Sequence, residues 1–81
     1  MTDSQNLNRV RWRCRRGTLE LDTILGGFFR HRYTGLSVAE QADFERLLAQ
    51  PDHLLGAWLE QGLPAPDDLR EIVSKIRWAS G

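Results

Sequence analysis

Apolar residues recur at spacings of three and four along most of this chain, and this periodicity constrains its fold more than any other feature. Residues at such spacings share one face of an α-helix, whereas a half-buried strand needs strict alternation of apolar and polar residues. No stretch alternates for long enough to make a strand. We therefore expect an all-α protein, folded as a compact bundle of short helices.

Five helices are predicted from the apolar stripes and the residues that interrupt them. The expected helices cover about residues 7–16, 18–31 and 37–49, then run from Pro51 to Gly62 and from Asp67 onward. Ser37 and Glu40 form a capping box, in which each side chain bonds to the backbone of the other residue. Gly17 is expected to be either the C′ residue of the first helix or the N-cap of the second.

Gly26 and Gly27 lie in the middle of the second predicted helix, where each costs about 1 kcal/mol relative to alanine. We expect close packing of another backbone against the pair to offset this cost. A phosphate-binding loop would instead place its glycines between a strand and a helix. No cofactor-binding residues are therefore predicted.

The length of 81 residues indicates one domain, with little volume for a deep reaction cavity. We treat residues 1–81 as a single helical domain that is folded over 7–79, with 1–6 expected to be flexible. No apolar run reaches the roughly 20 residues that span a bilayer, and no secretion signal opens the sequence. The expected location is the cytoplasm, without membrane insertion.

The residues that most often perform chemistry are sparse. Cys14 is the only cysteine, so it cannot form an internal disulfide, and we expect it to be a small buried hydrophobic residue. His31 and His53 have no partner at metal-ligand spacing, and no nucleophile motif accompanies them. We predict no catalytic residue and no metal site.

A net charge of zero conceals an uneven distribution of charge. Residues 1–32 carry seven arginines against three carboxylates, whereas residues 33–81 carry four cations against eight carboxylates. Such a dipolar protein can be steered towards a complementary partner. The arginines around Trp12 could also contact phosphates and stack on a base, but the neighbouring carboxylates would repel a long polyanion. Nucleic-acid binding is therefore a less favoured alternative.

Arg16, Gly17 and Glu20 allow two interpretations from the residues alone. Glycine as N-cap with a glutamate three positions later is half a capping box, which would leave Arg16 as a solvated charge. The arginines and Trp12 beside these residues favour a docking surface instead, because arginine and tryptophan are enriched at binding hot spots.

The same stretch resembles the signature of a known family. Arg16-Gly17-x-x-Glu20 matches the Arg-Gly-x-x-Glu motif of the flavinator proteins, the succinate dehydrogenase assembly factors called SdhE in bacteria and long described by a YgfY-type domain. Further residues at the family's spacing are Phe28, Phe29, His31, Tyr33, Leu36, Ser37, Phe44, Leu47, Leu48, Asp52, Leu55, Trp58, Leu59, Gly62 and Pro64. The resemblance covers nearly the whole chain.

This resemblance implies a five-helix assembly factor, not an enzyme. Its implied role is to bind the flavoprotein subunit of succinate dehydrogenase, or of the related fumarate reductase, and to promote covalent attachment of FAD. FAD would stay on the partner, so no cofactor is bound stably. The partner-binding residues it implies are Trp12, Arg15, Arg16, Gly17, Glu20, Asp22, His31 and Tyr33. An antitoxin-like regulatory module that binds another protein is the alternative from a different class.

Overall fold

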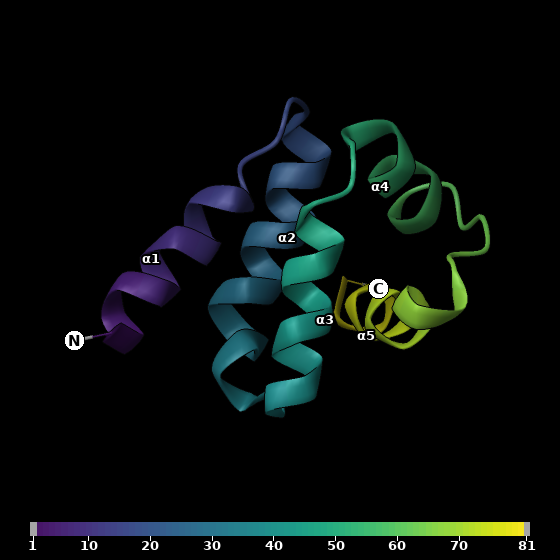
Figure 1. The fold of residues 1–81 in the computed structure, drawn as a ribbon. Coiled ribbons are helices and arrows are strands. Elements are labelled where there is room, and N and C mark those ends of the chain that lie inside the picture. The colour runs from purple at the N-terminus through teal and green to yellow at the C-terminus, as the bar shows by residue number, and fades with distance from the viewer. Residues whose placement is uncertain (1, 81) are drawn as a thin grey trace.

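The computed structural model describes the backbone of residues 2–80 and the side chains of residues 7–79. Within this range the chain forms five α-helices and no strand (Figure 1). The helices are α1 (Thr2–Arg13), α2 (Leu19–Arg32), α3 (Val38–Leu48), α4 (Asp52–Leu59) and α5 (Arg70–Ser80). Short 3-10 turns follow α2 at Tyr33–Gly35 and precede α5 at Asp67–Leu69. The prediction of an all-α, five-helix fold is confirmed.

The second helix is central to the arrangement of the other four. α5 packs against α2, α3 and α4, and α2 also contacts α4. Figure 1 shows α1 on one side of α2 and α5 on the other. Each side of α2 therefore faces a different neighbouring helix.

The core begins with three aromatic rings where α2, the turn after it and α3 meet. The centroids of Phe28 and Phe44 are 5.5 Å apart, as are those of Tyr33 and Phe44. Aliphatic side chains and Trp58 extend this cluster between the helices. The other buried apolar residues are Val10, Cys14, Leu21, Leu25, Leu47, Leu48, Leu55, Trp58, Leu59, Ala65, Leu69, Ile72, Val73 and Ile76. The apolar stripes predicted from the sequence are therefore the faces that pack.

The capping box at the start of α3 and the turn at Gly62 agree with the predictions. Ser37 Oγ accepts from the Glu40 N–H at 3.1 Å, and Glu40 Oε1 accepts from the Ser37 N–H at 2.9 Å, which confirms the capping box. Beyond α4, Gly62 has a φ of 76°, a conformation that glycine adopts without strain. It turns the chain away from the helix, as expected.

The boundary between the first two helices differs from the prediction. α1 covers Thr2–Arg13 where residues 7–16 were expected. Gly17 is neither the C′ residue of α1 nor the N-cap of α2. Thr18 is the N-cap, and its Oγ1 accepts from the Leu21 N–H at 3.2 Å. Threonine takes this position because its side-chain oxygen can accept the bond, whereas glycine has no such group.

The expected close packing at Gly26 and Gly27 is also wrong. A Cβ added to either glycine would meet no atom within 4 Å, apart from the neighbouring residues and the helix's own backbone. Gly26 instead lines a groove between α1 and α2. Gly27 lines a smaller hollow on the α5 side of α2. Among the described residues, no packed neighbour offsets the cost of these glycines to the helix.

Replacing either glycine by alanine should therefore stabilise the protein. We expect Gly26→Ala and Gly27→Ala each to raise the free energy of unfolding by about 1 kcal/mol, because alanine favours the helix and restricts the unfolded chain. Thermal unfolding followed by circular dichroism should show a rise in Tm of roughly 4–8 °C for each variant. Ala42→Gly, at an exposed position within α3, is the control and should lower Tm. Unchanged or lower values for both glycine variants would show that an unseen contact depends on the bare backbone.

Candidate partner-binding site

The side chain of Arg16 points into the molecule and joins two loops. Its Nη1 donates to the carbonyls of Arg13 and Leu48 at 3.0 and 2.9 Å, and its Nη2 donates to the Gln50 carbonyl at 2.8 Å. Its Nε donates to Asp52 Oδ1 at 2.7 Å. The side chain is only 14% exposed. Four of its five N–H groups are thus used within the chain.

Two of these acceptors are the last carbonyls of helices. Arg13 ends α1 and Leu48 ends α3, and the carbonyls in the last turn of a helix have no partner within it. A cation at this end also interacts favourably with the helix dipole. Arg16 therefore caps α1 and α3 together and fixes the ends of the two helices relative to each other.

Asp52, the first residue of α4, accepts from both members of the Arg-Gly pair. While its Oδ1 accepts from Arg16 Nε, its Oδ2 accepts from the Gly17 N–H at 2.9 Å. The hydrogen bond from Arg16, followed by that from the Gly17 amide, holds the pKa of Asp52 below its usual value. Asp22 holds the other side of the loop, since its Oδ1 accepts from the Arg16 N–H. Both carboxylates thus fix the segment between α1 and α2.

A contact within the chain favours glycine at position 17. A Cβ at this position would lie 3.0 Å from Asp52 Oδ2, the oxygen that accepts from the Gly17 amide. Any side chain would push the carboxylate away and weaken its bonds to the loop. The residue is nevertheless exposed, so its backbone remains open to a partner.

Glu20 points outward, in contrast to Arg16. It lies in the first turn of α2 and is exposed, and its side chain has no hydrogen bond or ion pair within the described residues. Leu19 beside it is 77% exposed. Across the loop, Trp12 is 68% exposed, and the Arg15 guanidinium lies 5.6 Å from the centroid of its ring. We call Trp12, Arg15, Gly17, Leu19 and Glu20 the motif surface.

The motif surface has the composition of a docking site. It combines exposed apolar side chains with charges of both signs, and a cation over a tryptophan ring is partly ordered before any partner arrives. Leu19 was assigned no function from the sequence. Its exposure on a helix beside Glu20 is the structural signal that adds it to the candidates.

Besides Arg16, whose side chain bonds within the chain, three predicted partner-binding residues lie outside the motif surface. Asp22 is half-buried against the loop, as described above. The Tyr33 ring is buried in the core, and its hydroxyl donates to Glu45 Oε2 at 3.3 Å. His31 is exposed, but it is 11 residues from Glu20, or roughly 16 Å along α2. Their roles in partner contact stay predictions, and only His31 is well exposed.

Cys14 is buried, as predicted, and burial raises its pKa to about 11 although Arg16 and Arg13 lower it. Its thiol is therefore unsuited to act as a nucleophile. Residues 7–79 contain no group of three or more histidine, cysteine or acidic side chains arranged to hold a metal. No described helix is both long and apolar enough to cross a membrane.

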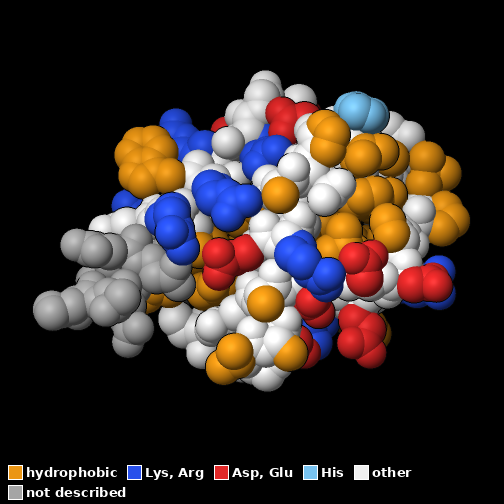
Figure 2. Space-filling view, in the orientation of Figure 1, with side chains coloured by type: hydrophobic (Ala, Val, Ile, Leu, Met, Phe, Trp, Pro, Cys, Tyr) orange, Lys and Arg blue, Asp and Glu red, His pale blue; other side chains and the backbone are white. Residues whose placement is uncertain are grey.

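The uneven charge of the sequence is visible on the surface. In Figure 2, basic side chains gather towards α1 and the loop after it, and acidic side chains gather on the opposite side, near the turn that precedes α5. There Arg46 contacts Asp43 and Asp68, and Arg70 contacts Asp67. The acidic side is thus partly neutralised by its own ion pairs.

A family model and individual relatives indicate the same family for this chain. Residues 8–79 match the family Sdh5, described as the flavinator of succinate dehydrogenase. The FAD assembly factor SdhE of Coxiella burnetii is 40% identical over 73 residues, which cover 89% of each chain. That of Pseudomonas aeruginosa is 40% identical over 77 residues, which cover 94% of this chain and 92% of the relative. The FAD assembly factor SdhE of a Serratia strain is 41% identical over 76 residues, which cover 93% of this chain and 86% of the relative.

The internal role of Asp52 predicts how stability depends on pH. Asp52→Asn should lower the free energy of unfolding at neutral pH, because an amide oxygen accepts weaker hydrogen bonds from Arg16 and Gly17 than a carboxylate does. The folded-state pKa of Asp52 is lowered, so its contribution is complete above the unfolded value of about 3.9 and is lost as pH falls through the folded value. Denaturant unfolding at a series of pH values should show the two proteins converging in acid.

Asp67→Asn is the matched control for this measurement. Asp67 also pairs with an arginine, but its side chain is 91% exposed, and such surface pairs contribute little. If Asp67→Asn and Asp52→Asn changed stability equally at neutral pH, the internal role of Asp52 would be wrong.

Proposed function

The chain belongs to the Sdh5 family of succinate dehydrogenase flavinators, and from this membership we propose that it is an FAD assembly factor. In this role it binds the flavoprotein subunit of succinate dehydrogenase and promotes covalent attachment of its flavin. The proposal extends to the flavoprotein of the related fumarate reductase. The observation that carries it is the match over residues 8–79, which includes the whole Arg-Gly-x-x-Glu motif.

The proposed role is that of an accessory protein without catalytic residues. Attachment of flavin to a protein side chain needs a nucleophile close to the ring, removal of a proton and stabilisation of charge. We assign all three to the flavoprotein. The family is one of assembly factors, and Cys14, the only thiol of this chain, is buried with a raised pKa.

The chain acts by selecting a conformation of its partner. It binds the FAD-loaded subunit, favours an arrangement in which flavin and nucleophile can react, and dissociates afterwards. FAD stays with the flavoprotein, so this chain holds no flavin stably. The relatives are bacterial proteins, and the proposed place of action is the bacterial cytoplasm.

Within the motif we propose a division of roles. Arg16 and Asp52 keep the loop in one shape, whereas Glu20, Leu19 and Trp12 contact the flavoprotein. The support for this division is geometric: the Arg16 guanidinium is used within the chain, whereas Glu20 is exposed. Gly17 contributes to both roles, because it accommodates Asp52 and leaves its backbone open.

Co-expression with the flavoprotein subunit tests the function directly. The wild-type chain should increase covalent flavin, measured as in-gel fluorescence of the subunit. Glu20→Ala should reduce this increase roughly tenfold or more, as expected for a central interface residue, while thermal unfolding stays unchanged. Arg16→Ala should lower both the flavin and the stability.

Glu71→Ala is the matched control, since Glu71 is also exposed in the first turn of a helix. It should leave covalent flavin at the wild-type value. No increase of covalent flavin with the wild-type chain would refute the proposed function. A normal increase with Glu20→Ala would refute the role of Glu20 alone.

A further inference from the structure

The groove between α1 and α2 has arginines on both walls. Its volume is about 770 Å³. Arg11 and Arg15 lie on the α1 side, and Arg30 lies on the α2 side; all three are exposed. Leu7 and Phe29 are half-buried between these walls and supply apolar surface. The groove thus offers apolar contacts in the middle and cations at its edges.

No carboxylate of residues 7–79 forms an ion pair with these cations. Asp22 is the one acidic residue among the described lining residues, and it already accepts from the Arg16 N–H. Within residues 7–79, none of the three lining arginines has an ion-pair partner, and the Arg15 guanidinium lies over the Trp12 ring. The groove therefore presents a positive potential to an incoming molecule.

Gly26 keeps the floor of the groove open. It lines the groove, and a Cβ at this position would project into space free of other atoms within 4 Å. A glycine in mid-helix lowers the stability of the free chain, and a close-packed neighbour is the usual compensation. The described residues provide no such neighbour, whereas a docked segment of a partner would. This observation is independent of the arginines.

We propose that the groove between α1 and α2 receives an acidic segment of the flavoprotein, with carboxylates on either side of an apolar side chain. The proposal rests on the proposed function for the identity of the partner. The apolar side chain packs on Phe29 and Leu7 over Gly26. The flanking carboxylates pair with Arg30 on one wall and Arg11 on the other, in the bidentate geometry that guanidinium favours.

The groove is continuous with the motif surface. Arg15 belongs to both, since it lines the groove and lies over the Trp12 ring. A partner that contacts Trp12 and Glu20 can therefore extend into the groove without a break. The acidic segment enlarges the interface and fixes its orientation by charge.

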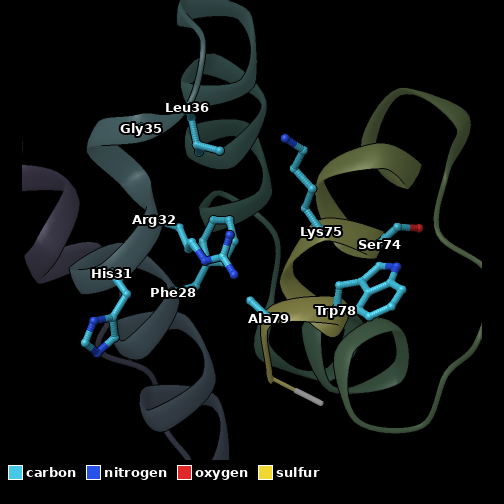
Figure 3. Close-up of a pocket in the computed structure, with 9 residues that line it drawn as sticks. All are labelled: Phe28, His31, Arg32, Gly35, Leu36, Ser74, Lys75, Trp78 and Ala79. Atoms are coloured by element: carbon cyan, nitrogen blue, oxygen red, sulfur yellow. The ribbon is translucent and has the colours of Figure 1, made fainter.

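The opposite side of α2 provides matched controls. Figure 3 shows Phe28 and Arg32 between α2 and α5, with Lys75 above them and Trp78 on the outer side of α5. Lys75 is already paired with Glu40 at 2.7 Å. Gly27 and Arg32 lie on this side of α2, and they resemble Gly26 and Arg30 in residue type and helical position.

The first test fills each side of α2 in turn. Affinity for the purified flavoprotein subunit would be measured for the wild-type chain, Gly26→Leu and Gly27→Leu, and circular dichroism would confirm that all three fold. Gly26→Leu should weaken binding by about tenfold or more, because the new side chain occupies the groove. Gly27→Leu should bind within about twofold of the wild type. Equal affinities of the two variants would overturn the proposal.

The second test reverses one charge on each side. Arg30→Glu and Arg32→Glu change the net charge equally, and both residues lie in the last turn of α2, so long-range and dipole effects match. Arg30→Glu should bind at least about tenfold more weakly than Arg32→Glu, and its affinity should depend less on salt. Equal losses would overturn the proposal.

The outcomes separate this inference from the proposed function. If the wild-type chain does not bind the flavoprotein, both are overturned. If it binds and Gly26→Leu binds equally well, only the acidic-segment inference is overturned. A dimer of the free chain that Gly26→Leu abolishes would show that a second copy occupies the groove, and would overturn the inference as well.

Discussion

The Arg16 guanidinium is the contact on which the arrangement of the N-terminal half depends. It bonds to the last carbonyls of α1 and α3, to the loop between α3 and α4, and to the first residue of α4. A planar group with five donors can serve these acceptors at once, whereas a lysine ammonium has only three donors on a single nitrogen. Because α1 is short and amphipathic, its position beside α2 relies on this contact as well as on Val10 and Cys14 in the core.

Both proposed binding surfaces, the motif surface and the groove, depend on the position of α1 beside α2. The motif surface needs Trp12 and Glu20 held at a fixed separation, and the loop between them is fastened by Asp52 and Asp22. The groove exists only while α1 and α2 stay side by side. The internal contacts of the Arg-Gly pair therefore set the position from which Glu20 contacts the partner.

The sequence predicted those features that depend on local signals. The apolar stripes and the Ser37–Glu40 capping box were identified correctly because residues three and four apart determine them. The pairing of Arg16 with Asp52 joins residues 36 positions apart, and no periodicity reveals such a contact. At Thr18 the sequence did hold a usable signal, since a threonine before an acidic first turn is a favoured N-cap. At Gly26, the expectation of internal packing was wrong because the space beside it is open.

A double-mutant cycle between Arg16 and Asp52 tests the central claim most directly. Denaturation midpoints would be measured at neutral pH for the wild type, Arg16→Ala, Asp52→Ala and the double variant. We expect Asp52→Ala to lower the midpoint strongly in the wild type and much less once Arg16 is alanine, since the two residues share one contact. Equal effects of Asp52→Ala in both backgrounds would mean that the residues act independently, and would contradict the account.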